Sequence, residues 1–258
     1  MPNSTPLPSG ALSRRSVITV LLLATALSLF LGWSLGAREA DRAWLLGAGK
    51  ADHDVIDAYS HWAFEHWRDT FHGMYWMGVP ILEYPVDMWE MQEVIYKTKP
   101  DVLIETGTYK GGSSLFFASL FDLIGKGRVI TVDILEQPNR PTHPRITYLV
   151  GSSTSPGVLR QIEGMIKPGE HVMVFLDSDH HTRHVTKELN LYSPLVTLGD
   201  YLVVADTNPY LQLADGTPPG PGVAVASFLE NDADFVQDMS HQKWGYSDFP
   251  GGWLKRVR

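Results

Sequence analysis

Short runs of aliphatic and β-branched residues recur along the second half of the chain, and amphipathic stretches separate them. Each run ends at a polar or glycine-rich turn, which is typical of buried strands. The expected strands are residues 102–104, 128–134, 146–150, 171–176 and 201–205. The expected helices are residues 115–120, 156–166, 184–198 and 223–230. Strands that alternate with helices predict an α/β fold with a mostly parallel central sheet and helices on both faces.

The pattern differs at the two ends of this domain. Residues 234–239 and 253–257 are predicted to be closing strands joined by a Gly-rich turn, so the sheet should end in antiparallel pairing. Residues 38–97 are rich in aromatic side chains and have helical spacing in places. We therefore expect a Rossmann-like domain over residues 98–258, preceded by a helical, aromatic-rich segment.

The N-terminal end has a different composition from the rest. Residues 1–15 are rich in Pro and Ser and are predicted to be a disordered tail, whereas residues 16–37 contain no charged side chain. An uncharged run of this length can cross a bilayer as a helix. A cleaved secretory signal is the alternative, but the run exceeds the usual length of a signal core. We expect a single-pass membrane anchor, and arginines on both flanks leave its orientation open.

Composition excludes several classes of protein. The formal net charge is −8, and no basic cluster offsets it, so we expect no nucleic-acid partner. The chain has no cysteine, which excludes disulfides, thiolate metal sites and a cysteine nucleophile. Homo-oligomer formation stays open.

A polar, glycine-rich turn follows the first strand of the domain. Glu105 stands at the tip of this strand, and Gly107, Gly111 and Gly112 follow in the turn. Glycines allow a close backbone approach or a positive φ, and a strand, tight turn and helix N-terminus can hold a nucleotide-like ligand. Asp133 ends the second strand, where an acidic residue binds ribose hydroxyls in dinucleotide and nucleoside folds. These features predict a nucleotide-like cofactor.

Acidic residues also follow the fourth and fifth strands. Asp177, Asp179 and Asp206 should meet at one edge of the sheet, where carboxylate oxygens favour Mg²⁺ or a similar ion. Asp179 has a second interpretation, as a cap of the following helix. His180 has the reach and pKa range of a general base. An iron site made of His180, His181 and a carboxylate is the less favoured alternative.

These motifs resemble a known family. The run ETGTYKGGS, residues 105–113, resembles the cofactor loop of class I S-adenosylmethionine O-methyltransferases of the catechol type. More narrowly, the chain from about Trp76 onward resembles the cephalosporin hydroxylase/rhamnosyl O-methyltransferase family. The carrying motifs are GVP, YP, IETGTYKGGSS, LDSDHH, VVADTN and PGGWLKR, in this order. The resemblance implies a Rossmann-like class I methyltransferase fold.

The resemblance also implies roles for individual residues. The cofactor side would be formed by Glu105, Gly107, Tyr109, Gly111, Ser113, Asp133, Ser152, Ser153 and Asp177. Within this set, Asp133 would bind the ribose and Ser152 or Ser153 would lie near the adenine. The metal would be held by Asp177, Asp179 and Asp206, and His180 stands where the catechol-type enzymes place a catalytic lysine. One departure is at the fifth strand tip, where relatives often have Glu-Asp and this chain has Ala205-Asp206.

The resulting functional hypothesis is an S-adenosylmethionine-dependent O-methyltransferase assisted by Mg²⁺ or a similar cation. Its substrate would be a hydroxyl of a sugar or a natural-product-like small molecule, selected by residues 59–89 and by a Pro/Gly-rich lid at 211–222. The rivals are an NAD(P)-dependent oxidoreductase, a non-haem hydroxylase, and a membrane-tethered binding protein with a degenerate methyltransferase fold. The absence of a G-x-G-x-x-G motif argues against the oxidoreductase.

Overall fold

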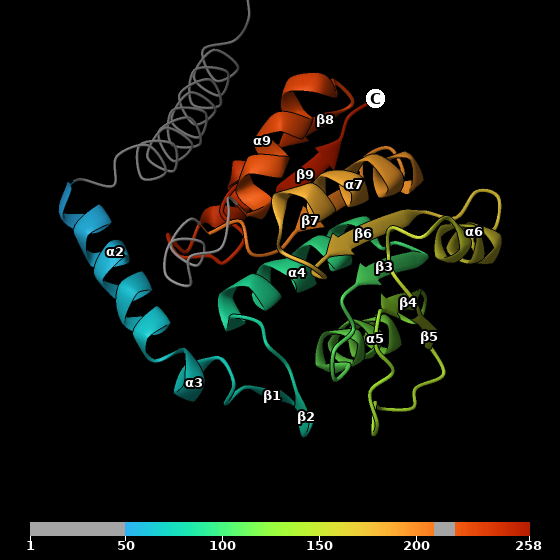
Figure 1. Cartoon of the computed structure of the whole chain (residues 1–258), viewed down its shortest axis with the longest axis horizontal. Helices are drawn as coiled ribbons and strands as arrows, with labels where there is room; N and C mark the ends of the chain where they lie inside the picture. Colours follow the sequence, from blue (N-terminus) through green and yellow to red (C-terminus); the bar gives the residue numbers. More distant parts are fainter. Residues whose placement is uncertain (1–49, 209–219) are drawn as a thin grey trace, which may run out of the picture. The chain divides into compact units, whose positions relative to one another are not determined.

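The computed structural model describes residues 50–208 and 220–258. Its main feature is a seven-stranded sheet with the strand order β5-β4-β3-β6-β7-β9-β8 (Figure 1). The strands are β3 (Val102–Thr106), β4 (Arg128–Asp133), β5 (Ile146–Val150), β6 (Val172–Leu176), β7 (Tyr201–Val204), β8 (Phe235–Gln237) and β9 (Trp253–Arg256). The first five are parallel, and β9 pairs antiparallel with both β7 and β8. The predicted Rossmann-like sheet with an antiparallel end is confirmed.

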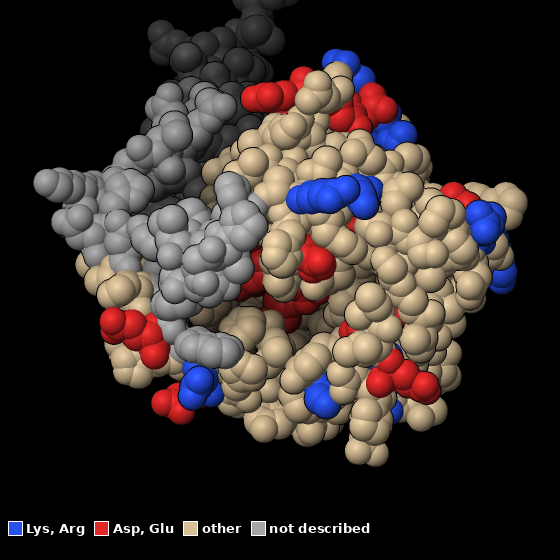
Figure 2. All heavy atoms as spheres, in the orientation of Figure 1, with Lys and Arg blue, Asp and Glu red and all other residues tan. Residues whose placement is uncertain are grey.

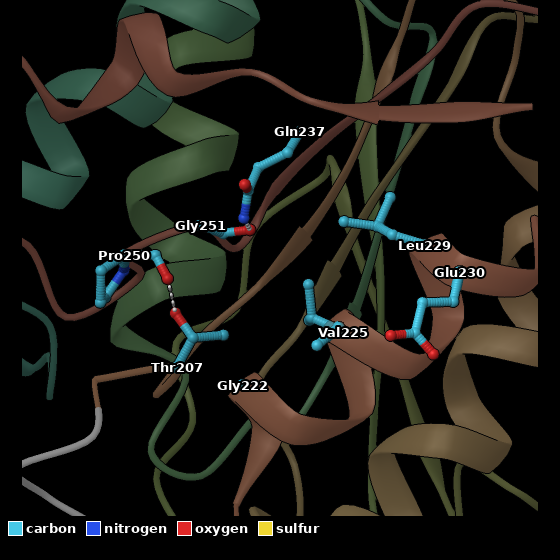
Figure 3. A pocket seen from close by; sticks show the side chains of 9 residues that line it. Thr207, Gly222, Val225, Leu229, Glu230, Gln237, Pro250 and Gly251 are labelled. Carbon is cyan, nitrogen blue, oxygen red and sulfur yellow. Dashed lines mark hydrogen bonds between the residues drawn. The ribbon is translucent and has the colours of Figure 1, made fainter. Parts of the chain in front are cut away.

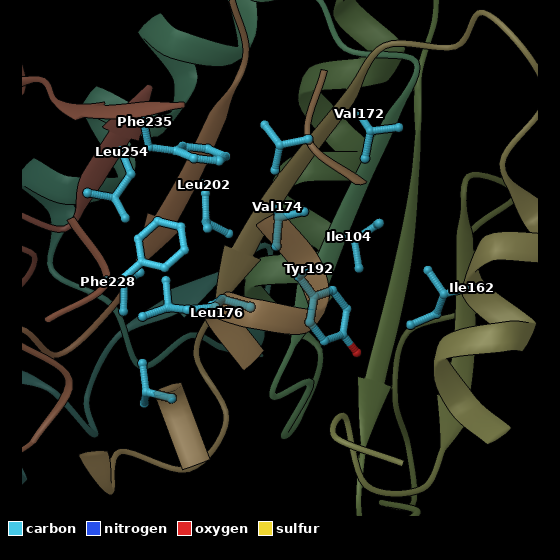
Figure 4. Close-up of a cluster of buried hydrophobic side chains, with 14 of the residues drawn as sticks. Ile104, Ile162, Val172, Val174, Leu176, Tyr192, Leu202, Phe228, Phe235 and Leu254 are labelled. Atoms are coloured by element: carbon cyan, nitrogen blue, oxygen red, sulfur yellow. The ribbon is translucent and has the colours of Figure 1, made fainter. Parts of the chain in front are cut away.

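Helices cover both faces of this sheet because successive strand residues point to opposite sides. The helices that pack on it are α4 (Pro85–Thr98), α5 (Gly112–Ile124), α6 (Pro156–Met165), α7 (Thr182–Tyr192) and α9 (Pro221–Asn231). Ile104, Val174 and Leu202 face one side and are fully buried with side chains of α6, α7 and α9 (Figure 4). Leu103 and Phe175 face the other side, where they pack with side chains of α4 and α5.

A short hairpin precedes α4 and lies on the start of α5. The elements before α4 are α2 (Lys50–Glu65), α3 (Trp67–Thr70), β1 (Tyr75–Trp76) and β2 (Val79–Pro80). β1 and β2 pair antiparallel, and the Ile81 N–H donates to the Met74 carbonyl at 3.0 Å. A Cβ on Gly112 would lie 2.1 Å from the Pro80 carbonyl oxygen, so only glycine permits this approach. The segment that contains Pro80 is therefore held against the start of α5.

Two helices differ most in length from the sequence prediction, whereas α6 and α9 lie within two residues of the expected bounds at each end. α5 begins at Gly112 and runs to Ile124, because Gly111 and Gly125 adopt left-handed conformations at its ends, with φ of 83° and 84°. α7 stops at Tyr192, and a 3₁₀ turn, η1 (Ser193–Leu195), follows. Pro194 has no N–H to continue the helix, which explains why the expected helix does not reach residue 198. A second 3₁₀ turn, η2 (Met239–Gln242), follows β8.

Several predictions concern residues outside the described part of the chain. The expected tail at 1–15, the expected anchor at 16–37 and most of the expected lid at 211–222 belong to this group. Among the residues that the structure does describe, no helix is both long enough and apolar enough to span a bilayer.

Candidate functional site

The turn after β3 is fixed by its own polar side chains. Glu105 is completely buried, and its two carboxylate oxygens accept hydrogen bonds from the Ser113 and Ser114 hydroxyls on α5. Burial raises the pKa of Glu105, and these hydrogen bonds act in the opposite direction. The Ser113–Glu105 hydrogen bond thus connects the end of β3 to the start of α5. Both residues are buried beside the expected cofactor turn.

Gly107 joins this turn to the neighbouring strand. It has a φ of 91°, and a Cβ at this position would lie 1.7 Å from the Asp177 carbonyl oxygen. Since no real side chain tolerates such a distance, the position requires glycine. The backbone after β3 and the backbone after β6 are therefore in direct contact.

Asp133 orders the rest of the turn from the tip of β4. Its carboxylate accepts hydrogen bonds from the Tyr109 N–H at 2.7 Å and from the Leu135 N–H at 2.9 Å. The buried guanidinium of Arg140 lies 3.3 Å from the same carboxylate and donates to the Tyr109 carbonyl at 2.9 Å. The Tyr109 ring is 44% exposed, and Gly111 follows it at the start of α5. Sequence reasoning missed Arg140, because nothing local shows that the segment after β4 folds back.

The two serines after β5 differ in their surroundings. The Ser152 hydroxyl lies 3.1 Å from that of Thr154, whereas the buried Ser153 hydroxyl lies 3.0 Å from Nε2 of His184. His184 in turn contacts Glu188 at 3.5 Å. The predicted adenine side is thus lined by a serine whose hydroxyl is already oriented by a helix α7 histidine.

A second group of polar side chains lies at the tips of β6 and β7. Asp177, His180 and Asp206 each offer one ligand atom, and these atoms all lie within 4.8 Å of one another. Nδ1 of His180 is 2.8 Å from an Asp206 carboxylate oxygen. Asp206 has a left-handed φ of 54°, a conformation that is uncommon outside glycine and often marks functional positions. The structure therefore brings together three of the residues singled out in the sequence.

Asp179 and His181 do not join this group. Asp179 accepts hydrogen bonds from the His181 N–H at 3.0 Å and from the His181 ring at 2.5 Å. His181 is the N-cap residue that directly precedes α7. Asp179 thus stabilises the turn just before α7, and its hydrogen bonds go to His181 and not to the N–H groups of the helix. The same contact separates Asp179 and His181 from the group of Asp177, His180 and Asp206.

Three further carboxylates surround the group and were missed in the sequence. Glu83, Asp87 and Asp248 are 4%, 1% and 1% exposed. Asp248 shares a hydrogen bond with Asp206, and Glu83 shares one with Asp177. We call these three residues, together with Asp177, His180 and Asp206, the acidic cluster. Glu83 is an acidic residue within an otherwise apolar stretch before Pro85, and this sequence signal could have identified it.

The pKa values in the acidic cluster follow from its shortage of positively charged side chains. Burial, followed by the negative charge of neighbouring carboxylates, raises the pKa of Glu83, Asp177 and Asp248 well above the usual values. Burial is the largest influence on Asp206 and opposes its ionisation, but the His180 charge and the hydrogen bonds of Asp206 together outweigh burial and lower the Asp206 pKa. The same contact raises the pKa of His180 to about 10. Figure 2 shows carboxylates inside a hollow in one face of the molecule.

The residues present fit a hard divalent cation. Glu83 Oε1 and Asp248 Oδ1 are buried and have no hydrogen-bond partner within the described residues. Buried carboxylate oxygens without partners are costly unless a cation or proton satisfies them. Oxygen donors are also the ligands that Mg²⁺ prefers. Asp177, Asp206 and their neighbours would hold such an ion.

Two cavities lie near the described polar groups. One, of about 440 Å³, lies beside the acidic cluster and is lined by Glu83 and by apolar side chains that include Trp76, Met88 and Phe116. The other, of about 300 Å³, lies between α9 and the turn before β9 (Figure 3). At its edge the Thr207 hydroxyl donates to the Pro250 carbonyl at 2.9 Å. The second cavity contains none of the predicted site residues.

Comparisons with known proteins agree with these features. The family model described as rhamnosyl O-methyltransferase/CmcI matches residues 68–257. A rhamnosyl O-methyltransferase of Mycobacterium bovis BCG is 33% identical over 219 residues, which cover 78% of this chain and 85% of the relative. The protein of that name from Mycobacterium leprae is 33% identical over 217 residues, covering 78% and 90%.

Solved structures show the same architecture. A structure of CmcI with Mg and SAM has a TM-score of 0.57 and 21% identity, and the match covers 75% of this chain and 84% of that one. A CmcI structure with SAH has a TM-score of 0.52 and 20% identity, covering 74% and 90%. At this identity the likeness demonstrates a shared fold. The sequence matches go further, and by them the chain belongs to the rhamnosyl O-methyltransferase/CmcI family.

Proposed function

We propose that this protein transfers the methyl group of S-adenosylmethionine to a hydroxyl of a sugar or another natural-product-like molecule, assisted by Mg²⁺ or a similar cation. One observation carries the proposal: the Gly107 turn, which is shaped for a cofactor, is in backbone contact with Asp177 in the acidic cluster. A methyl donor on one side and an activated hydroxyl on the other would thus be neighbours. Relatives of this chain are rhamnosyl O-methyltransferases.

The assignment of the cofactor site is supported by the polar residues at the tips of β3, β4 and β5 and by the glycine turn between them. Asp133 is the residue we assign to the ribose hydroxyls, and Arg140 keeps its carboxylate in place. The Gly107 turn brings backbone rather than side chains to the cofactor, which leaves room for the methionine end. Ser153, oriented by His184, would lie at the adenine.

The acceptor side uses the acidic cluster. A cation held by Asp177 and Asp206 would act as a Lewis acid and lower the pKa of the acceptor hydroxyl. His180, whose side chain is 52% exposed, would take the hydroxyl proton as the oxygen attacks the methyl carbon in line with the departing sulfur. S-adenosylhomocysteine leaves, and the proton remains on the imidazole until solvent removes it. Holding oxygen and methyl in near-attack geometry would supply much of the rate.

The Asp206 charge, 2.8 Å from His180, raises the pKa of His180 to about 10 and so favours the protonated imidazole when no cation is bound. A base role requires that the Asp206 charge be offset by another positive group. This requirement makes methyl transfer dependent on the cation.

The apolar cavity beside Glu83 favours acceptors that carry an apolar part. Its aromatic and aliphatic lining, from Trp76 to Phe116, suits a ring or alkyl group rather than a second charged group. We therefore propose an acceptor whose hydroxyl-bearing part reaches the acidic cluster while an apolar part occupies this cavity.

The test is methyl transfer from labelled S-adenosylmethionine to rhamnosyl and other glycosides, with and without EDTA. Transfer that EDTA abolishes and Mg²⁺ restores is expected. Binding of NADH tighter than that of S-adenosylhomocysteine in calorimetry would overturn the proposal. Cofactor binding without transfer to any acceptor would instead favour a binding protein, an alternative that Ala205 at the tip of β7 supports.

The membrane anchor at 16–37 is a separate proposal, supported by the length and apolarity of that run. Fractionation followed by protease protection in sealed vesicles tests it. Recovery of the full-length chain in the soluble fraction would contradict it.

A further inference from the structure

We propose that Glu83, from the segment before α4, is a direct ligand of the cation in the acidic cluster, together with Asp177 and Asp206. The inference rests on the proposed function only in assuming that a cation binds. Magnesium takes oxygen ligands in an octahedral arrangement, from one or two carboxylates in most sites, with water among the rest. The tip of β7 supplies one carboxylate, because Ala205 precedes Asp206 and is buried with its side chain in the core. Any carboxylate ligand beyond Asp177 and Asp206 has to come from another element.

Glu83 is placed to provide it. Its carboxyl group shares a hydrogen bond with Asp177, and the groups that act on it most strongly are carboxylates, with Asp177 and Asp206 first. The side chain is 4% exposed, and Oε1 has no hydrogen-bond partner among the described residues. A purely structural glutamate at this depth would be expected to have both oxygens satisfied. A cation held by Asp177 and Asp206 would satisfy this buried oxygen if the Glu83 side chain turned toward the ion.

The surrounding chain holds Glu83 in this position. Ile81 and Met88, on either side of it, are buried in the same core cluster as Ala205. Glu83 thus enters from the face of the sheet toward which the Ala205 side chain points. The approach of Pro80 to Gly112 and the start of α4 at Pro85 fix the backbone on both sides. Because packing fixes the backbone of this segment, it holds the Glu83 carboxylate in place.

Asp248 is the competing candidate, since its Oδ1 is also buried and unpartnered. Its backbone is bound on both sides: its N–H donates to Asp87 at 2.8 Å, and its carbonyl accepts from the Asn208 N–H at 3.2 Å. Its carboxyl group hydrogen-bonds to Asp206 and feels Asp177 less strongly. We therefore assign Asp248 to positioning Asp206, and Glu83 to the cation itself.

The test measures cation affinity directly, by Mn²⁺ electron paramagnetic resonance and by Mg²⁺ calorimetry on the full chain without acceptor. The Glu83→Gln variant keeps the size of the side chain and removes its charge. We expect its Mn²⁺ affinity to fall by more than about 100-fold, because changes at residues that only support a ligand cost about 10- to 100-fold. A fall within that smaller range would make Glu83 a positioning residue of Asp177 and overturn the direct-ligand role. The matched control is Glu93→Gln on α4, the helix that follows Glu83; Glu93 pairs with Lys243 at the surface, and this variant should bind Mn²⁺ as wild type does. The double variant Glu83→Gln/Ala205→Glu should regain affinity.

Other results of these measurements would overturn the ligand role of Glu83. Equal Mn²⁺ affinity for Glu83→Gln and wild type overturns the ligand role and leaves Glu83 as a buried, protonated structural acid. If Glu83→Gln fails to fold by circular dichroism, Glu83→Asp replaces it, and unchanged affinity in that shortened variant overturns the proposal equally. Wild type that binds S-adenosylhomocysteine but no Mn²⁺ overturns this inference and the metal assistance together. Wild type that binds neither overturns the proposed function itself.

Discussion

Two groups of carboxylates at opposite edges of the parallel sheet differ in how their charges are paired. At the amino edge, Glu170 pairs with Arg128 at 2.6 Å and Asp101 pairs with Lys126 at 2.9 Å. At the carboxyl edge, the acidic cluster has His180 against five carboxylates. The first arrangement lowers the pKa of its acids and the second raises most of them. The Glu170 and Asp101 pairs are satisfied as folded, whereas the acidic cluster has few positive groups to offset its carboxylates. Asp200, before β7, is an exception at the amino edge, because burial raises its pKa to about 6.

The largest difference between substitutions at the two edges is expected in the rate of methyl transfer. His180→Gln should lower the methyl-transfer rate by about 10²- to 10⁴-fold, the usual contribution of a general base. Arg128→Met, at the other edge, should leave the rate unchanged when both are measured below the melting temperature. Steady-state kinetics with saturating S-adenosylmethionine check this. An Arg128→Met loss equal to that of His180→Gln would remove the distinction between the edges.

Stability should respond with opposite signs. Asp177→Asn relieves a buried, crowded carboxylate, and we expect the metal-free protein to gain about 0.5–2 kcal/mol, as substitutions at functional sites often do. Glu170→Gln breaks a partly exposed ion pair and should cost about 1 kcal/mol or less. Urea denaturation with EDTA present measures both. Destabilisation by Asp177→Asn in EDTA would contradict the comparison.

The smallest effects are expected in the pH dependence of stability. The Arg128 contact lowers the pKa of Glu170 to about 2, so this group stabilises the fold above its unfolded pKa and loses that contribution as the pH falls toward 2. Asp87 has the opposite sign: burial raises its pKa to about 7, so its contribution is full below its unfolded pKa and is lost as the pH rises toward 7. Glu170→Gln should flatten the acid limb, and Asp87→Asn should flatten the stretch between about pH 4 and 7. Urea titrations at a series of pH values measure these slopes, and identical profiles for both variants would refute the assignment.

Local patterns were enough to predict the sheet and part of the site. Strands such as Val172–Leu176 are continuous apolar runs, and runs of that kind become the buried centre of a parallel sheet. Asp177, His180 and Asp206 could be placed together because parallel strands deliver their carboxyl ends to one edge.

The remaining site residues could not be predicted in this way. Glu83 and Asp248 are distant in the sequence from both strand tips, and their approach depends on how α4 and the last loop pack. Arg140 reaches the Tyr109 carbonyl only because the segment after β4 folds back. Asp179 was expected at the metal, but a one-residue hydrogen-bonded turn at the start of α7 takes its carboxylate toward His181. Tertiary packing, rather than residue type, decided each of these cases.

The contact between Gly107 and Asp177 has a consequence for how the two ligands of this site affect each other. The turn that would receive the cofactor and the residue that would hold the cation touch through backbone atoms, with no side chain to take up a displacement. A shift at one is transmitted to the other, so occupancy of one site should change the affinity of the other. By linkage the effect is reciprocal, and the cofactor would strengthen or weaken cation binding by the same factor that the cation applies to the cofactor.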